Sequence, residues 1–465
     1  MAANVKRLVI VGQGAAGLSA AVSAAEHAAR EQTPIEIALL EKAREDAAGG
    51  NSRWSPSYMR MAAPGRIAPD FEADMQHASG GRADKVYFRR LAEHAPATMQ
   101  WLEAHGVRFD TPTYYLSAGP PRIQPIGGGA ALIDQLLKAA RRMGVTIRYE
   151  ASATRLIVEG GIVRGVELNG DSKIDSDAIV LASGGFQGNP DMMAEFFGAG
   201  ARTMAMISPG SSFNTGDGIR LAIAAGATPS GDWNGMHAEP VDPRSRKPAP
   251  VVLVYPYGIV VEKNGNRFFD EGAGLVHETW ETFARDIHLN RPGSIAYAIL
   301  DSRLRDIAGF ERAIRSDVPP FEAATIEYLA RMIDVPPRAL QRTIETFNAA
   351  ATGDVARFDA THCDGLSAAT GLMPPKSNWA RPIGKPPFLA YPLIGAIAYT
   401  FGGVATNEKA EVLRNDLPIP GLYAAGEMTA HFHGTAPNAV SMLRSVVYGK
   451  IAGEEAATFM RARGA

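Results

Sequence analysis

The stretch RLVIVGQGAAGLSAAVSAAEHA at residues 7–28 decides the fold of this chain. The apolar run at residues 8–11 predicts a buried β-strand, and the alanine-rich segment from about residue 15 predicts an α-helix. Between them, Gly12, Gly14 and Gly17 form a G-x-G-x-x-G turn, whose backbone N–H groups can approach a phosphate at the positive end of the helix. The stretch therefore predicts the dinucleotide-binding unit of an α/β protein.

The next predicted strand and its loop indicate which dinucleotide is bound. The segment IEIALLEKA at residues 35–43 brings Glu41 to a strand end, where an acid accepts hydrogen bonds from ribose hydroxyls. The following segment AGGNSRWSPSYMRM, residues 48–61, contains a Gly-Gly-Asn-Ser turn that a nicotinamide dehydrogenase does not need. Such a turn suits a flavin enzyme, in which a second loop of small residues passes beside the diphosphate and the isoalloxazine. We therefore expect FAD.

Composition narrows the possible partners. The 465 residues are 46% hydrophobic and 21% charged, with a net charge of −2, so neither nucleic acid nor an anionic membrane is expected as a partner. No apolar run of about 18 residues occurs, and we expect a cytoplasmic protein without a transmembrane segment. The single cysteine, Cys363, excludes an internal disulfide and is expected to be a buried apolar thiol. No metal is expected, because only His431 and His433 approach a ligand spacing.

The order of the segments predicts a discontinuous architecture. Residues 1–230 are expected to form the first part of a Rossmann-like FAD-binding domain, and residues 388–465 the second part. Proline-rich segments lie at residues 240–250 and 372–388, and the sequence pattern changes beyond residue 230. Residues 231–387 are therefore expected to form an inserted α+β capping domain. The fold class is therefore α/β, with a cap inserted between two parts of one nucleotide-binding domain.

Two local patterns bear on the site. The segment FNTGDGIRLAIAAGA at residues 213–227 predicts a helix that Asn214 or Thr215 caps. The segment VVLVYPYGIVVEKNGNRFFDEGAG at residues 251–274 predicts strands joined by an Asn-Gly turn, with Tyr255 and Tyr257 on one strand face. Both segments are expected to lie near the flavin or its substrate.

Several motifs together resemble the flavoproteins of the fumarate reductase and succinate dehydrogenase superfamily. They are VIVGQGAAGLSAA, LLEKA followed by GGNS, LASGGF, NTGDGIRLA, GNRFFDEG, and GLYAAGEMT followed by NAVSML and YGKIAGEEAA, and they fall in that family's order from end to end. The segments GGNSRWSPSYMRM, LASGGFQGNPDMM and NRFFDEGAG look most like the branch of FAD-dependent tricarballylate dehydrogenases. Flavoproteins of aerobic precorrin processing and ketosteroid dehydrogenases are similar but more distant.

The resemblance implies which residues bind FAD. Succinate dehydrogenases attach their flavin through a histidine after the Gly-Gly-Ser turn, whereas Arg53 and Trp54 follow Ser52 here, so non-covalent FAD is expected. The cofactor-binding residues are expected to be Gly12, Gly14, Ala15, Ala16, Gly17, Glu41, Lys42, Gly49, Gly50, Asn51, Ser52, Ala153, Ala182, Ser183, Gly184, Asn214, Thr215, Asp217, Glu427, Asn438, Ser441, Met442 and Leu443.

The sequence also departs from that family at the substrate side. In fumarate reductases, an arginine that acts as the catalytic acid follows a few residues after R-F-x-N-E. At that position this chain has Leu275, Val276 and His277. Their second arginine is missing from the shortened segment HGTAPNAV, and Tyr399 replaces the histidine before T-M-G-G. Interconversion of succinate and fumarate is therefore not expected. The family's histidine that binds a substrate carboxylate matches His237 in GMHAEP.

Flavin oxidation beside an electron-withdrawing group needs a proton acceptor and hydrogen-bond donors for the developing negative charge. Each candidate also has a structural interpretation: a loop-bonded histidine, a core tyrosine, a solvated hairpin end or a surface ion pair. Tyr399 is expected to act beside the amides of Gly402 and Gly403, as in ketosteroid dehydrogenases. The catalytic candidates are His237, Tyr399, His431, His433, Glu271, Tyr255 and Arg60, with Tyr257 as a weaker one.

The leading hypothesis is an FAD-dependent oxidoreductase that desaturates or reduces a CH–CH bond next to a carboxylate or ketone. Its small-molecule substrate would exchange a hydride with flavin N5, and the electrons would pass to a separate acceptor. Three alternatives remain open. The first is an oxygen-using flavin enzyme that acts on a large ring substrate, and the second is an enone-forming enzyme similar to ketosteroid dehydrogenases. The third is a non-catalytic flavin-binding electron-transfer subunit.

Overall fold

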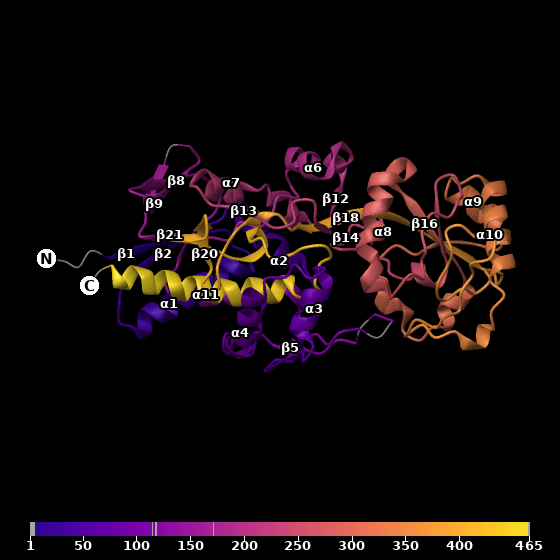
Figure 1. Ribbon diagram of the computed structural model, residues 1–465, viewed down its shortest axis with the longest axis horizontal. Helices are drawn as coiled ribbons and strands as arrows, with labels where there is room; N and C mark the ends of the chain where they lie inside the picture. The colour runs from indigo at the N-terminus through magenta and orange to yellow at the C-terminus, as the bar shows by residue number, and fades with distance from the viewer. Residues whose placement is uncertain (1–4, 114, 117–118, 171, 464–465) are drawn as a thin grey trace.

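The computed structural model describes residues 5–113, 115–116, 119–170 and 172–463. It is elongated, with both ends of the chain at one end of the long axis and helices α8, α9 and α10 toward the other end (Figure 1). A central six-stranded sheet has the order β20-β21-β11-β1-β2-β7, in which only β20 runs antiparallel to its neighbour. Its strands are β1 (Lys6–Val11), β2 (Ile35–Leu40), β7 (Thr146–Arg148), β11 (Ala178–Leu181), β20 (Glu411–Arg414) and β21 (Leu417–Ala424).

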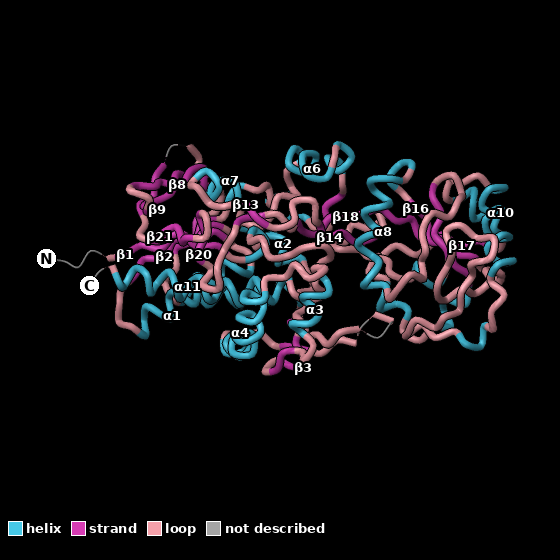
Figure 2. The backbone as a smooth tube through the Cα atoms, viewed as in Figure 1, coloured by secondary structure: helices cyan, strands magenta, loops and turns pink. Residues whose placement is uncertain are grey.

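Both faces of this sheet are covered. Leu8 and Ile10 of β1 point into one hydrophobic core and Val9 and Val11 into another, because alternate side chains of a strand face opposite ways. On the first face lie α1 (Ala15–Arg30), α4 (Lys85–Ala104), α5 (Gly128–Arg142) and α11 (Ser441–Ala462). On the second lie α7 (Asp217–Ala224) and the antiparallel sheet of β8 (Ala153–Glu159), β9 (Ile162–Leu168) and β10 (Ser172–Asp175) (Figure 2).

Helix α11 brings the end of the chain back to its beginning. It packs directly on α1, and two glycines four residues apart form the contact. A Cβ at Gly449 would lie 2.3 Å from the carbonyl oxygen of Ala16, and one at Gly453 would lie 2.2 Å from that of Ala20. These glycines therefore let the backbones approach closely, which places the middle of α11 beside the beginning of α1.

A second sheet connects the nucleotide-binding part to the cap. Strand β18 (Phe388–Thr400) is its centre: residues 388–393 pair with β16, and residues 394–400 pair with β14. The other members are β12 (Ala205–Met206), β14 (Met236–Val241), β15 (Ile259–Glu262), β16 (Ala296–Asp301) and β17 (Phe321–Ala323). Helices α8 (Val276–Asn290), α9 (Ile326–Met332) and α10 (Pro337–Ala350) complete the cap. The division at residues 230/231 and 387/388 stays a prediction.

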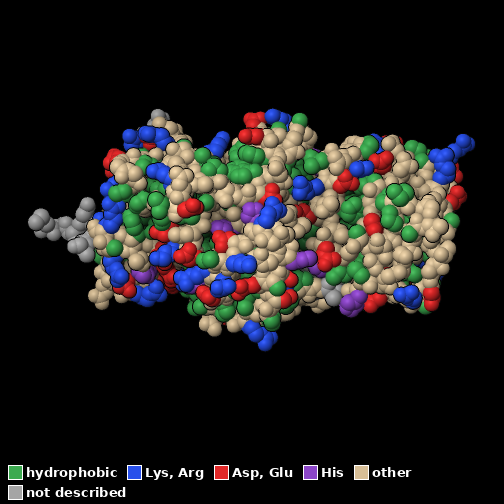
Figure 3. Space-filling model, in the orientation of Figure 1, with side chains coloured by type: hydrophobic (Ala, Val, Ile, Leu, Met, Phe, Trp, Pro, Cys, Tyr) green, Lys and Arg blue, Asp and Glu red, His purple; other side chains and the backbone are tan. Residues whose placement is uncertain are grey.

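Shorter elements complete the chain. They are α2 (Gly50–Trp54), α3 (Phe71–Ala78), α6 (Pro190–Phe197), β3 (Met61–Ala63), β4 (Arg66–Ile67), β5 (Phe109–Asp110), β6 (Gln124–Pro125), β13 (Pro229–Ser230) and β19 (Gly403–Val404). Acidic and basic side chains are mixed across the face shown in Figure 3. Within the described residues, no helix combines the length and the apolar character that a membrane crossing needs.

The structure confirms the predicted α/β fold class, and it corrects three local predictions. Tyr255 and Tyr257 lie in a 3₁₀ turn, Tyr255–Tyr257, because Pro256 between them has no N–H to donate to a strand. Helix α7 begins after Gly216, whose φ is +76°, and no side chain caps it. Cys363 is exposed rather than buried.

Candidate active site

A deep pocket opens at the carboxyl ends of β1, β2 and β11, where ligands of parallel α/β sheets bind. It encloses about 1830 Å³ of empty space, counting the part that opens to solvent. The beginnings of α1 and α11 both reach it. Most of the predicted cofactor-binding residues line it: Gly12, Gly14, Ala15, Ala16, Glu41, Lys42, Gly50, Asn51, Ser52, Ala153, Ala182, Ser183, Gly184, Asn214, Asp217, Glu427, Asn438, Ser441 and Met442.

The glycine turn is built for close approach. Gly12 has φ +105°, and a Cβ there would lie 2.4 Å from the carbonyl oxygen of Ala182. A Cβ at Gly17 would lie 1.9 Å from the carbonyl oxygen of Gly12, so Gly17 supports the turn from behind and does not line the pocket. The Ala15 N–H at the start of α1 donates to the Ser52 hydroxyl over 3.2 Å, which joins the two small-residue loops.

Glu41 is held in place at the end of β2. Its Oε2 accepts the N–H of Gln13 over 2.9 Å and its Oε1 accepts the N–H of Ala43 over 2.8 Å. Each oxygen keeps a lone pair for a ribose hydroxyl. Beside it, the Lys42 ammonium pairs with Asp217 over 2.8 Å. Burial alone would raise the pKa of the Asp217 carboxyl, but the contact with Lys42 outweighs burial and lowers it.

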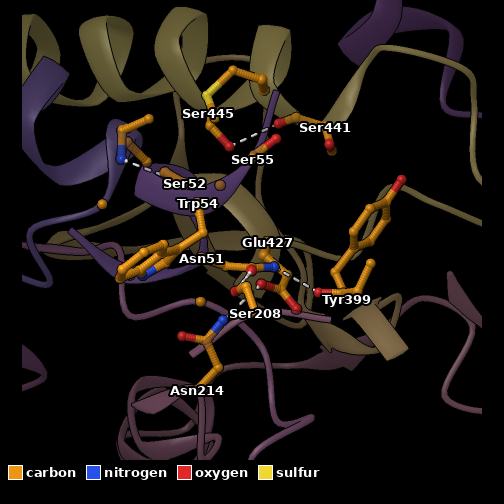
Figure 4. Close-up of a pocket in the computed structure, with 18 of the residues that line it drawn as sticks. Asn51, Ser52, Trp54, Ser55, Ser208, Asn214, Tyr399, Glu427, Ser441 and Ser445 are labelled. Atoms are coloured by element: carbon orange, nitrogen blue, oxygen red, sulfur yellow. Dashed lines mark hydrogen bonds between the residues drawn. The ribbon is translucent and has the colours of Figure 1, made fainter. Parts of the chain in front are cut away.

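Glu427 and Asn51 link the two parts of the nucleotide-binding region. Glu427 accepts hydrogen bonds from the Thr400 N–H over 3.0 Å and from the side-chain amide of Asn214 over 3.1 Å. Burial raises the pKa of Glu427 to about 7 despite these donors. Asn51 donates to the carbonyl oxygen of Ala398 over 2.7 Å and accepts from the Ser208 hydroxyl over 2.5 Å. Figure 4 shows Asn51, Ser208 and Glu427 between Trp54 and Tyr399.

The residues of this pocket fit FAD. The glycine turn lines the pocket at the beginning of α1, where backbone N–H groups can meet a phosphate, and Glu41 offers acceptors for a ribose. Two buried polar atoms of lining residues, the indole Nε1 of Trp54 and the amide Oε1 of Gln13, have no hydrogen-bond partner among the described residues. Buried polar groups are normally bonded, so both atoms are suited to a ligand. Gly49, Thr215 and Leu443 are predicted cofactor residues that do not line the pocket.

His237 lies at the end of the pocket next to the cap. Its Nδ1 is 2.9 Å from Glu281 Oε2 on α8, and its Nε2 is 3.1 Å from Glu239 Oε1 on the same strand, β14. Burial would lower the pKa of His237, but its hydrogen bonds and attraction to both glutamates outweigh burial and raise it to about 9. At neutral pH His237 is therefore an imidazolium and not the proton acceptor that the sequence led us to expect.

Aromatic side chains surround that end of the pocket. Tyr399 of β18 lies with its ring centroid 4.8 Å from that of His237, and Trp280 of α8 lies 6.0 Å from His237 on another side. Burial raises the pKa of Tyr399, so its hydroxyl is a neutral donor. Gly402 and Gly403 do not line the pocket in the way expected for partners of Tyr399, because they pack against Trp233 and Met428.

Two arginines at this end of the pocket were not predicted from the sequence as site residues. The Arg122 guanidinium is 3% exposed and lies over the rings of Tyr58, 3.7 Å away, and Tyr115, 4.7 Å away. Arg315, from the cap, is half-buried and lines the same end. Neither lies in a recognisable motif, so only the fold brings them together.

Other residues of the pocket wall were also missed, and some carried a sequence signal. Glu239 follows His237 by two residues on one strand, which is the spacing that places side chains on one face. Arg444 interrupts an apolar helix. The further missed residues are Gln13, Trp54, Tyr58, Tyr115, Ser208, Trp280 and Ser445.

Five predicted catalytic residues do not line the pocket. The ring of His431 stacks on Tyr87 with centroids 3.5 Å apart, its Nε2 meets the Thr406 hydroxyl at 2.8 Å, and burial lowers its pKa well below the usual value. His433 lies at intermediate exposure beyond it, so the two histidines do not share a pocket face.

The other three serve contacts elsewhere. Glu271 is fully buried in the cap, where its Oε2 pairs with Arg267 over 2.7 Å. The Tyr255 hydroxyl meets the Thr279 hydroxyl at 3.0 Å. Arg60 is buried and pairs with Asp70 and Asp74, while its backbone N–H donates to Ala439.

A glycine turn, a ribose-binding acid and a pocket formed by two distant chain segments define an FAD-binding flavoprotein of the parallel α/β type. The FAD binding domain family matches residues 7–443, and the chain belongs to this family, close to its fumarate reductases.

Two curated relatives and one solved structure illustrate the relationship. The chain is 30% identical over 479 residues to a probable fumarate reductase of Shewanella frigidimarina (strain NCIMB 400), which covers 97% of this chain and 74% of the relative. It is 30% identical over 401 residues to a 4-oxocyclohexanecarboxylate 2-dehydrogenase of Sinomonas cyclohexanicum, covering 78% of this chain and 68% of the relative. The open conformation of a flavocytochrome c3 fumarate reductase matches with a TM-score of 0.77 at 26% identity, covering 98% of this chain and 78% of the other.

The protein is therefore an FAD-dependent oxidoreductase of the fumarate reductase family that acts on CH–CH groups. The narrower likeness to tricarballylate dehydrogenases stays a prediction.

Proposed function

We propose that this enzyme exchanges a hydride with a CH–CH bond next to a carboxylate, and that its substrate is a polycarboxylate of the tricarballylate kind. The observation that supports the proposal is the pair of arginines, Arg122 and Arg315, at the same end of the pocket as His237 and Tyr399. Arginine binds carboxylates through two parallel N–H bonds, so each of the two can hold one carboxylate.

The acids at this end of the pocket already have partners. Glu239 and Glu281 are both bonded to the ring of His237. The acid nearest to Arg315 in the chain, Asp317, accepts a hydrogen bond from the Ser245 hydroxyl over 2.6 Å, and Asp242 is bonded to Arg244 over 2.7 Å and to Ser316 over 2.9 Å. Arg315 is therefore available to a substrate anion.

The protein groups have distinct tasks in the proposed reaction. Bound FAD supplies the acceptor or donor of the hydride. Tyr399, kept neutral by burial, donates a hydrogen bond to the substrate oxygen that gains negative charge. Glu239 holds His237 through Oε1 and presents Oε2 as the group that takes or returns the proton. The ring of His237 keeps the Glu239 carboxylate oriented.

A cyclic ketone is the second candidate substrate. Tyr58, Tyr115, Trp280 and Tyr399 line the same end of the pocket, and such rings favour contact with a flat or cyclic molecule. The relative that acts on 4-oxocyclohexanecarboxylate combines a ring, a ketone and a carboxylate in its printed substrate name.

We further propose that the FAD is held non-covalently and that a separate acceptor, or oxygen, takes the electrons. Of the histidines in the described part of the chain, His237 alone lines the pocket, and glutamates occupy both its ring nitrogens. Arg53 follows Ser52 and pairs with Asp134 over 2.8 Å. A cytoplasmic location stays a prediction.

The proposal is tested by turnover with an artificial electron acceptor. Tricarballylate, succinate, 4-oxocyclohexanecarboxylate and cyclohexanone are compared by kcat/KM, and the tricarboxylate is expected to be the best substrate. Arg315→Gln is expected to lower its kcat/KM roughly 10- to 100-fold, the worth of a charge-assisted hydrogen bond. Arg331→Gln, which removes an exposed cap arginine paired with Glu327, is the control and is expected to have no effect. Turnover of cyclohexanone alone would refute the proposal.

A further inference from the structure

Arg444 is a buried arginine whose charge the fold leaves unmatched. Its side chain is 1% exposed and lines the pocket. Its Nη1 donates to the carbonyl oxygen of Thr429 over 3.2 Å, and its guanidinium lies 3.7 Å from the centre of the Phe432 ring. Its Nε and Nη2 have no hydrogen-bond partner among the described residues. A buried, incompletely bonded cation is costly, which indicates that a ligand completes it.

The position of Arg444 in its helix adds to that cost. Helix α11 begins at Ser441, so Arg444 lies in the first turn, where unpaired N–H groups already carry partial positive charge. A cation is unfavourable at that end of a helix, and no acidic residue in the first turn offsets it. The positive end of the helix and the arginine together favour an anion in the pocket.

Glu427, which Arg444 attracts, does not supply that anion. Its carboxylate is already bonded to the Thr400 N–H and to the amides of Asn214 and Gln187. The Nη1 of Arg444 donates to a carbonyl oxygen, and within the described residues no carboxylate is bonded to its Nε or Nη2. The charge is therefore available to a molecule bound in the pocket.

We propose that Arg444 raises the reduction potential of the bound FAD. When a substrate C–H gives a hydride to oxidised flavin, two electrons and one proton arrive and the flavin ring gains one negative charge, while the second substrate proton goes to a base. A fixed positive charge beside the ring stabilises that reduced, anionic form over the neutral oxidised form. The inference needs only FAD binding and does not depend on the identity of the substrate.

The test compares reduction potentials of holoenzymes, measured by equilibration with reference dyes without any substrate. Arg444→Met removes the charge and keeps the bulk, Arg444→Lys keeps the charge, and Arg444→Gln is a second neutral variant. Arg461→Met is the matched control on the same helix, because Arg461 is distant from the pocket lining and pairs with Glu31. The neutral variants are expected to lower the reduced-to-oxidised ratio at a given potential at least about tenfold, which is about 30 mV for a two-electron couple.

Sulfite affinity provides a second measurement, since sulfite forms an anionic adduct with oxidised flavin. The neutral variants are expected to bind sulfite roughly tenfold more weakly, and the lysine variant and the Arg461 control are expected to match the wild type. An unchanged potential in a neutral variant that holds FAD would overturn the proposal. So would a loss of FAD affinity at unchanged potential, which would assign the charge to the diphosphate. If every neutral variant fails to retain FAD while Arg444→Lys retains it, Arg444 serves binding and the proposal fails.

Discussion

Replacing Glu281 by glutamine tests the charge state that the structure gives to His237. Glu281 Oε2 lies 2.9 Å from the Nδ1 of His237, and Glu239 holds the other ring nitrogen. The two carboxylates outweigh burial and raise the pKa of His237 from 6.5 to about 9, a preference for the imidazolium of about 3 kcal/mol. Removing one of the two is expected to lower that pKa by roughly one to two units. Glutamine keeps the oxygen that accepts the Ala436 N–H.

The pKa is measured by NMR titration of histidine nitrogens, with the His237 signal assigned from a His237→Gln variant. Asp286→Asn on the same helix is the control, because Asp286 pairs with Arg291 and not with His237. Stability gives an independent check. The pKa is higher in the folded protein, so the stabilisation is fully present below about pH 6.5 and is lost as the pH rises through about 9. A wild-type His237 that titrates at or below 6.5, or an unchanged pKa in Glu281→Gln, would refute the reasoning.

Three further perturbations test the rest of the site. Gly449→Ala is expected to lower the unfolding free energy by about 1–3 kcal/mol despite alanine's better helix propensity, because its Cβ meets the Ala16 carbonyl oxygen; a stabilised variant in thermal melts would contradict the packing of α11 on α1. Glu41→Ala is expected to raise the dissociation constant of FAD at least about tenfold by freeing the Gln13 N–H and losing a ribose acceptor, and unchanged affinity in a fluorescence titration would exclude that role. In the wild type, the buried Glu427 carboxyl must ionise as the pH rises from 4.5 through about 7, which lowers the unfolding free energy by up to about 3 kcal/mol. Glu427→Gln is expected to remove this pH dependence, and denaturation curves with equal pH slopes for both proteins would disprove it.

The cofactor half of the site could be predicted from sequence because its chemistry is local. A glycine turn between a strand and a helix fixes where the phosphates approach, so Gly12, Gly14 and Ala15 were placed in the pocket wall without a structure. Glu41 followed from its position at the next strand end. The return of the last helix was also predictable, because the small residues at its beginning, such as Ser441, suit close contact with a flat ring.

The substrate half could not be predicted in the same way because its residues meet only through tertiary structure. Arg122 comes from a loop of the nucleotide-binding region and Arg315 from the cap, and no spacing rule connects them. His237 was found by its position, but its charge depends on Glu281, which lies 44 residues away on α8. A sequence shows residue types and not the burial and partners that set their pKa values.

The histidines near the end of the chain show the converse error. The spacing of His431 and His433 is typical of a shared face on an extended segment, yet His431 is buried and His433 is at intermediate exposure. The ring of His431 stacks on the ring of Tyr87, and His431 does not line the pocket. Chemistry-bearing residue types close to a motif therefore indicated a site, while packing decided which of them reach it.

The central claim is that this pocket holds FAD and passes electrons between it and a CH–CH bond of a carboxylate substrate. Anaerobic titration of the oxidised holoenzyme, followed by the visible absorption of the flavin, tests that claim most directly. The account predicts that tricarballylate bleaches the flavin of the wild type, and that Arg315→Gln needs a higher concentration of it for the same bleaching. A flavin that no carboxylate bleaches, and that an uncharged cyclic ketone bleaches equally in both proteins, would contradict the account.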